Sequence, residues 1–205
     1  MFFKKDKNSV NFIGRIYYFL LKKIFVVIEK IWLKEVVGEF PLNGAFIIAA
    51  NHVSFLDFML LMRVAEPQLH FFIKGKYFNK FYWKYFLKKM GQINIENGNN
   101  FLKNTLKIIK NGGIVAVFPE GTRTRTGELG EFLPGVAAIS ITTHTPIVPV
   151  AIKNIFNIWP YYQKWPKIKK EAVVVIGEPI FPPRDALMLT GKIKEEIEKL
   201  IAADE

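Results

Sequence analysis

The sequence predicts an α/β protein: a single domain with a mixed, mostly parallel sheet flanked by helices and preceded by an N-terminal amphipathic helical arm. Three observations predict this fold class. Short apolar runs alternate with longer segments of helical periodicity, turn-forming residues precede several of these runs, and the first 38 residues carry a basic, helical pattern. Half of the 205 residues are apolar, which is ample material for one core. We therefore expect an arm over residues 1–38 and the domain over residues 39–205.

The arm is expected to be a helix from Val10 to Leu33, about 36 Å long. Charged residues interrupt its apolar runs, so no stretch approaches the ~20 apolar residues that a membrane-spanning helix needs. The charged face repeats every seven residues at Arg15, Lys22 and Glu29, and the opposite apolar face contains Phe12, Phe19, Val26 and Leu33. This pattern is typical of a helix lying in the membrane interface, and packing on the domain's own core is the alternative. A signal peptide is less expected because no small-residue cleavage site follows.

Within the domain, strands and helices are expected to alternate. A strand is expected at Ala45–Ala50, after the turn-prone Asn43-Gly44, and a helix at Phe55–Val64. A central parallel strand is expected at Ile114–Phe118, because this apolar run follows the turn Asn111-Gly112-Gly113. The other expected elements are strands Leu69–Ile73 and Ala172–Ile176 and helices Phe101–Lys110, Gly135–Thr143 and Arg184–Ala203. The segment Phe78–Met90 mixes aromatic residues with lysines and is a second candidate for the membrane interface.

The first candidate functional segment is Asn51-His52-Val53-Ser54-Phe55-Leu56-Asp57, at a junction between strand and helix. Inside one helix, His52 and Asp57 would lie about 140° apart. With Ser54 as the N-cap, Asp57 becomes the third helical residue and the two side chains can converge. An imidazole held by a carboxylate on one nitrogen can accept a proton on the other, so a substrate hydroxyl could act as the nucleophile. The alternative is a capping box, which is a purely structural role.

The second candidate segment is Phe118-Pro119-Glu120-Gly121-Thr122-Arg123, directly after the expected central strand. Open α/β sheets bind ligands outside the carboxyl ends of their strands, where this segment would lie. Gly121 permits close backbone approach, Thr122 offers a hydroxyl, and Arg123 offers a forked donor for phosphate or carboxylate. A salt bridge within the loop between Glu120 and Arg123 is the structural alternative.

At these residues the chain resembles the glycerolipid acyltransferase family, whose members acylate lysophosphatidic acid, which is 1-acyl-sn-glycerol 3-phosphate. That family has an Asn-His, four residues, Asp motif and a Phe-Pro-Glu-Gly-Thr-Arg motif. A later Val-Pro-Val strand corresponds here to Ile147–Val150. All three motifs occur in the family's order, and the resemblance covers roughly Phe40–Ile180.

The resemblance implies an O-acyltransferase that moves a fatty acyl group from acyl-CoA or acyl carrier protein (acyl-ACP) to a lysophospholipid hydroxyl. With 1-acyl-sn-glycerol 3-phosphate as acceptor, the product is phosphatidic acid. Residues 39–205 are then the catalytic domain, with His52 as the base and Asp57 orienting it. The residues implied to help hold the acceptor are Glu120, Gly121, Thr122 and Arg123. No cofactor beyond the acyl donor and no metal is implied.

Some positions depart from the family pattern or bear on the acceptor. The family usually has an arginine that grips the acceptor phosphate after a Gly-x-Ile-x-Ile-like strand, and Asn97 stands there in this chain. Asparagine can form hydrogen bonds but cannot neutralise charge. Lys74 matches a basic family position near the pocket and could compensate, although it could equally be a solvated lysine at a strand end. Pro134-Gly135 replaces a Lys-Gly pair common in the family.

Composition narrows the function classes. The net charge of +11 favours anionic partners such as bilayer headgroups, acyl carrier protein or nucleic acid, but the chain has no nucleic-acid-binding motif. The absence of cysteine excludes disulfides, a thiol nucleophile and cysteine metal sites. The histidines His52, His70 and His144 show no metal-ligand spacing. We expect peripheral or monotopic attachment to the cytoplasmic face of the cytoplasmic membrane. The alternatives are acylation of a lyso-lipid that lacks a phosphomonoester, and a non-catalytic basic module that binds membrane or nucleic acid.

Overall fold

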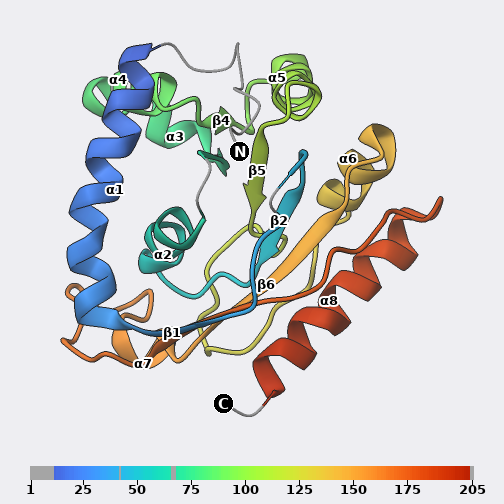
Figure 1. Cartoon of the computed structure of the whole chain (residues 1–205). Helices are drawn as coiled ribbons and strands as arrows, with labels where there is room; N and C mark the ends of the chain where they lie inside the picture. The colour runs from blue at the N-terminus through green and yellow to red at the C-terminus, as the bar shows by residue number, and fades with distance from the viewer. Residues whose placement is uncertain (1–11, 42, 66–67, 204–205) are drawn as a thin grey trace.

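Residues 12–41, 43–65 and 68–203 are described by a computed structural model of the chain (Figure 1). In this part of the chain, seven strands form one sheet in the order β1-β7-β6-β2-β5-β3-β4. The strands are β1 Leu33–Val37, β2 Ile47–Ala50, β3 Leu69–Ile73, β4 Ile93–Asn94, β5 Ile114–Val117, β6 Ile147–Lys153 and β7 Ala172–Ile176. The helices are α1 Phe12–Trp32, α2 Leu56–Val64, α3 Gly75–Phe78, α4 Phe81–Lys89, α5 Asn99–Lys110, α6 Gly135–Thr143, α7 Ile155–Ile158 and α8 Ala186–Ala202.

The sheet is mixed and mostly parallel, as predicted. Five neighbouring strands run parallel to one another: β6, β2, β5, β3 and β4. Strand β7 is antiparallel to β6. Strand β1 pairs in parallel with β7 at the outer edge. The five parallel strands therefore have their carboxyl ends at one edge of the sheet, which is where open α/β sheets place ligands.

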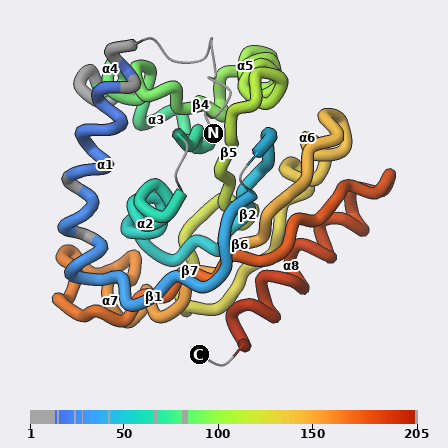
Figure 2. The backbone as a smooth tube through the Cα atoms, in the orientation of Figure 1, coloured from blue at the N-terminus to red at the C-terminus, as the bar shows by residue number. Residues whose placement is uncertain are grey.

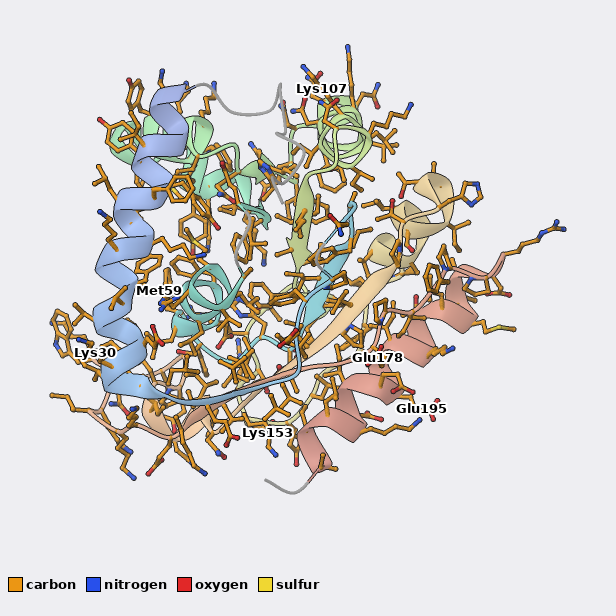
Figure 3. The ribbon with its side chains drawn as sticks, in the orientation of Figure 1. Lys30, Met59, Lys107, Lys153, Glu178 and Glu195 are labelled. Atoms are coloured by element: carbon orange, nitrogen blue, oxygen red, sulfur yellow. The ribbon has the colours of Figure 1, made fainter. Side chains whose placement is uncertain are left out.

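Helices cover both faces of the sheet and give three layers (Figure 1). The side chains of Ile48 and Ala50 point into the core beneath α1, α2 and α7, and those of Ile47 and Ala49 into the core beneath α5, α6 and α8. Strand β2 is buried along its whole length because it is covered on both sides. Charged side chains such as Lys30, Lys107 and Glu195 lie at the periphery of these layers (Figure 3).

The expected N-terminal helix is present as α1, and it packs on the domain. Tyr18 and Phe25 are buried in the core, and the Tyr18 hydroxyl oxygen accepts a hydrogen bond from the Leu69 backbone N–H at 3.0 Å. The outward side still carries exposed apolar residues, Ile16, Tyr17, Phe19, Leu20 and Val27. Both interpretations of this helix thus have support, because one face meets the core and another face remains apolar and exposed.

Several boundaries differ from the sequence-based expectation. Leu33, the expected last helical residue, is the first residue of β1, so a strand of the sheet lies inside the segment assigned to the arm. The segment Phe78–Met90 comprises the end of α3 and the whole of α4, with Phe78 and Leu87 buried and Tyr85 exposed. The path of the backbone shows α1 packing beside α2, with the C-terminal end of α1 near α7 (Figure 2).

Candidate active site

The two candidate segments meet at the carboxyl edge of the sheet. His52 follows β2 and Glu120 follows β5, and these two strands are hydrogen-bonded neighbours. Because neighbouring parallel strands end at the same edge, the loops that follow them come together although they are far apart in the sequence. The sequence-based expectation that both segments lie at strand ends is confirmed.

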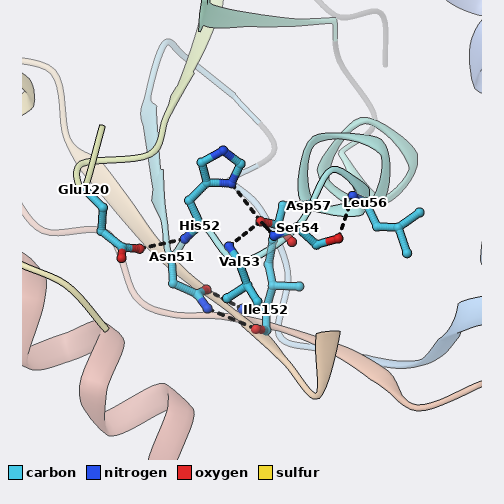
Figure 4. Close-up of polar contacts among 8 residues, drawn as sticks. All are labelled: Asn51, His52, Val53, Ser54, Leu56, Asp57, Glu120 and Ile152. Atoms are coloured by element: carbon cyan, nitrogen blue, oxygen red, sulfur yellow. Dashed lines mark hydrogen bonds and ion pairs between the residues drawn. The ribbon is translucent and has the colours of Figure 1, made fainter. Parts of the chain in front are cut away.

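His52 and Asp57 form a hydrogen-bonded pair (Figure 4). The imidazole Nδ1 lies 2.8 Å from the Asp57 Oδ2, and the Asp57 side chain is fully buried while that of His52 is 22% exposed. The same Oδ2 accepts hydrogen bonds from the backbone N–H groups of Val53 and Ser54, each at 2.7 Å. The carboxylate therefore holds the proton on Nδ1 and leaves Nε2, on the far side of the ring, to accept another proton.

The helix after His52 begins one residue later than expected. Phe55, and not Ser54, is the N-cap of α2, and Asp57 is the second helical residue. Ser54 still acts as a local cap, because its Oγ accepts a hydrogen bond from the Leu56 N–H at 3.3 Å. The convergence of His52 and Asp57 does not depend on this shift, since His52 lies outside the helix in either case.

The Phe118 ring covers one face of the His52 imidazole. The Phe118 ring stacks on the His52 ring with centroids 4.0 Å apart and an interplanar angle of 14°. Phe71 stacks on Phe118 in turn, with ring centroids 6.2 Å apart. Phe118 is the first residue of the second segment, and its contact with His52 could not be seen in the sequence. Asp57 thus holds one edge of the imidazole while Phe118 covers one of its faces.

The Glu120 carboxylate accepts hydrogen bonds from two backbone N–H groups. Its Oε1 accepts a hydrogen bond from the His52 N–H at 2.7 Å, and its Oε2 accepts one from the Gly130 N–H at 3.0 Å. The Thr124 N–H donates to the His52 carbonyl oxygen at 2.8 Å, so one loop holds both backbone groups of His52. Burial raises the pKa of Glu120, while the N–H groups of His52 and Gly130 act in the opposite direction.

Asn51 anchors the segment to a third strand. Its side-chain amide donates to the Ile152 carbonyl oxygen at 3.0 Å and accepts from the Ile152 N–H at 2.7 Å. This pair of bonds reproduces a strand-to-strand contact with β6 just where β2 ends. This role of Asn51 could not be predicted from the sequence, because nothing along the chain relates position 51 to position 152.

The other predicted site residues lie around the same edge. Gly121 has a left-handed backbone with φ +67°, and Thr122 is exposed. The Arg123 guanidinium lies 5.2 Å from the centre of the Phe55 ring, which faces it from the start of α2. Lys74 is exposed and directly follows β3, the neighbour of β5. The two remaining histidines have structural positions: His70 is buried with Nδ1 2.8 Å from the Gly91 carbonyl oxygen, and His144 caps α6.

The chain matches the family model described as "Acyltransferase" over residues 33–153, which include both candidate segments. It belongs to the acyltransferase family. It is 29% identical over 158 residues to a 1-acyl-sn-glycerol-3-phosphate acyltransferase of Bacillus subtilis, covering 74% of this chain and 73% of that protein. A Pseudomonas aeruginosa protein of the same name is 29% identical over 161 residues, with 72% of this chain and 62% of that protein covered.

A solved structure of another protein has the same fold as this chain. The 1-acyl-sn-glycerophosphate (LPA) acyltransferase PlsC from Thermotoga maritima superposes with a TM-score of 0.76 over 94% of this chain and 81% of that one. The two sequences are 22% identical, so this likeness concerns the fold. The likeness supports the fold described above, a mixed and mostly parallel sheet with flanking helices.

Replacing the histidine of the pair should abolish most turnover. Without Nε2 to accept the proton, His52→Ala is expected to lower kcat about 10²- to 10⁴-fold while the protein stays folded. Asp57→Asn should also lower kcat, because the imidazole loses its orienting charge. Acyl transfer is measured together with the thermal unfolding midpoint. The matched control is His144→Asn, which keeps the left-handed backbone at that position and should leave turnover unchanged. Near-normal turnover by folded His52→Ala would contradict this assignment.

Glu120→Gln separates two roles for that residue. Glutamine keeps the shape but turns an NH₂ group toward one of two backbone N–H donors, so His52 should lose part of its support. We expect kcat to fall about tenfold, with little change in the KM for the acceptor. The matched control is Glu131→Gln in the same loop, where the side chain is 92% exposed. A higher acceptor KM with unchanged kcat would show instead that Glu120 holds the acceptor directly.

Proposed function

We propose that this chain transfers a fatty acyl group from acyl-CoA or acyl-ACP to the free hydroxyl of 1-acyl-sn-glycerol 3-phosphate, giving phosphatidic acid. The observation that carries the proposal is the hydrogen-bonded pair of His52 and Asp57 at the carboxyl edge of the sheet. Supporting it, the B. subtilis and P. aeruginosa relatives are both named for an acyltransferase acting on this acceptor. The intact pair also favours an enzyme over a non-catalytic binding module.

The chemistry needs one group that takes a proton and later returns it. His52 Nε2 takes the proton of the acceptor hydroxyl as the hydroxyl oxygen attacks the thioester carbonyl carbon. The buried Asp57 carboxylate stabilises the imidazolium that forms. Collapse of the tetrahedral intermediate breaks the carbon–sulfur bond, and the imidazolium protonates the departing thiolate. The products are the new ester and a free thiol, and His52 is neutral again.

The acceptor phosphate is proposed to bind beside Arg123 and Lys74. Arg123 lies in the loop that holds His52, and its guanidinium rests over Phe55, so its fork is positioned at the same sheet edge. Lys74 lies at the end of a neighbouring strand. Gly121 and Thr122 complete the segment, where the left-handed glycine permits close backbone approach. In this proposal Glu120 acts on the acceptor only through the loop that it holds in place.

The protein is proposed to act at the cytoplasmic face of the cytoplasmic membrane, with the part of segment 1–38 that precedes β1 contributing a membrane-associating arm to the catalytic domain. The acceptor is a membrane lipid, and the net charge of +11 favours anionic headgroups. The exposed apolar side of α1 supplies area that can enter the interface. Among the described residues, no helix is both long and apolar enough to cross a membrane.

The proposed function is tested with purified protein and a panel of lyso-lipids, each offered with acyl-CoA and with acyl-ACP. Radiolabelled product is separated by thin-layer chromatography. We expect phosphatidic acid from 1-acyl-sn-glycerol 3-phosphate with at least one donor, and loss of that product with His52→Ala. Absence of acylated product from every pair of acceptor and donor would overturn the proposal.

Arg123→Lys tests the phosphate site. Lysine cannot reproduce a bidentate guanidinium fork, so the KM for a phosphate-bearing acceptor should rise at least about tenfold while the donor KM stays nearly constant. The matched control is Arg125→Lys in the same loop, where the guanidinium faces Tyr161. That change should leave the acceptor KM close to normal. A defect seen only in the donor KM would assign this loop to the other substrate.

Asn97 supports a second candidate acceptor, a lyso-lipid without a phosphomonoester. The side chain is exposed in the turn between β4 and α5, where the family usually has an arginine, and it brings no positive charge. If Asn97 merely weakens phosphate binding, Asn97→Arg should lower the KM for lysophosphatidic acid by restoring a charge-assisted contact. If the natural acceptor lacks that phosphate, the change should impair the native reaction. No effect on any acceptor would place position 97 outside the pocket.

A further inference from the structure

The loop after α7 is unusually apolar for an exposed segment. In this aromatic–basic loop, residues 159–170, Trp165 is 70% exposed, Ile168 84% and Tyr162 66%. Exposed large apolar side chains are common singly, but three within seven residues concentrate apolar surface on one loop. No role was assigned to this segment from the sequence.

Lysines lie between these apolar residues. The exposed members are Lys164, Lys167, Lys169 and Lys170. The Lys164 ammonium lies 5.8 Å from the centre of the Trp165 ring, and Glu171 at the end of the loop pairs with Lys169 at 3.3 Å. Tryptophan and tyrosine mixed with lysine suit the headgroup region of a bilayer, where a ring meets both acyl chains and water.

Hydrogen bonds hold the loop in a defined shape. The Lys167 N–H donates to the Ile158 carbonyl oxygen at 2.9 Å, which closes the loop on itself. The Trp159 indole N–H donates to the Gln163 carbonyl oxygen at 2.8 Å. The Trp32 indole N–H, from the end of α1, donates to the Lys167 carbonyl oxygen at 2.7 Å. The exposed side chains are therefore presented by an ordered backbone that is tied to the arm.

The base of the loop packs against the first segment of the active site and against Arg125, which lies just after the second segment. Trp159 contacts Phe55 with ring centroids 6.2 Å apart, and Phe55 follows Ser54 at the start of α2. The Arg125 guanidinium lies 5.7 Å from the centre of the Tyr161 ring. The loop thus stands at the edge of the sheet where His52 lies.

We propose that the aromatic–basic loop docks the protein on an anionic bilayer, with Trp165 and Ile168 entering the headgroup region and the lysines binding acidic headgroups. This inference rests on the proposed function, because the docked loop would hold the active site against the membrane that contains the acceptor. A bilayer suits the loop better than an acidic carrier protein does. Lysines alone would serve a carrier protein, whereas the exposed isoleucine and tryptophan need an apolar phase.

The chain contains no cysteine, so a single introduced cysteine can report on this surface. Ile168→Cys is labelled with an environment-sensitive NBD group and mixed with vesicles containing phosphatidylglycerol. We expect a blue shift and increased emission, weaker with phosphatidylcholine alone and reduced by salt. The matched control is labelled Leu187→Cys, which is 74% exposed at the start of α8, far from α7 (Figure 1). It should show no shift.

A double variant tests the contribution to binding. Trp165→Ser with Ile168→Ser should weaken partitioning onto anionic vesicles at least about tenfold in co-sedimentation. Its turnover of a water-soluble short-chain acceptor should match that of the unmodified protein, which also shows that it is folded. The comparison variant, Phe181→Ser with Met188→Ser, removes exposed apolar side chains elsewhere and should bind normally.

The outcomes separate this proposal from the proposed function. No emission change at position 168 with anionic vesicles, or a change with acyl-ACP alone, would overturn membrane docking by the loop. Normal vesicle binding by the Trp165 and Ile168 double variant would overturn it too. A labelled protein that shows the shift but acylates no lyso-lipid would leave docking in place and reject the proposed function.

Discussion

The rest of the site depends on a single carboxylate oxygen of Asp57. Burying a carboxylate is costly unless hydrogen bonds replace its hydration, and here three donors converge on Oδ2: the His52 ring and the N–H groups of Val53 and Ser54. These bonds join the end of β2, the first turn of α2 and the imidazole. The capping and catalytic interpretations of this segment therefore overlap, because the carboxylate that accepts from the Ser54 N–H, as in half of a capping box, also orients the base.

Glu120, in the loop after the neighbouring strand β5, also holds His52 in place. Asp57 holds His52 by its ring, whereas Glu120 holds it by its backbone N–H and reaches Gly130 with its other oxygen. Both carboxylates therefore act on one histidine from loops that follow different strands. This arrangement requires β2 and β5 to be adjacent and parallel, which the register of Ile47 with Val115 provides. The sheet order is thus a requirement of the site and not only its background.

Much of the fold could be predicted because strands covered on both faces are continuous apolar runs. The predicted bounds of Leu69–Ile73, Gly135–Thr143 and Ala172–Ile176 agree with β3, α6 and β7. Strand β1 could not be predicted, since four of its five residues are exposed and its pairing with β7 joins distant parts of the chain. The same limit applies to Asn51 and Glu120, whose partners Ile152 and Gly130 become neighbours only after folding. The approach of His52 to Asp57 was predictable because it is local: His52 lies just before the helix whose first turn carries Asp57.

The arm and the catalytic edge are mechanically connected. The Tyr18 hydroxyl oxygen accepts a hydrogen bond from the Leu69 N–H, and burial raises the pKa of this phenol. Lys22 Nζ donates a hydrogen bond to the Ala65 carbonyl oxygen at 2.5 Å. These contacts fix α1 to the domain while Phe19 remains 61% exposed. At its other end, Trp32 binds the aromatic–basic loop. The exposed side of α1 and the aromatic–basic loop are joined in this way. Under the proposed membrane association, they would together set the tilt of the domain on the bilayer. Because the loop also packs against Phe55, that tilt would bring the His52 edge toward the lipid that carries the acceptor hydroxyl.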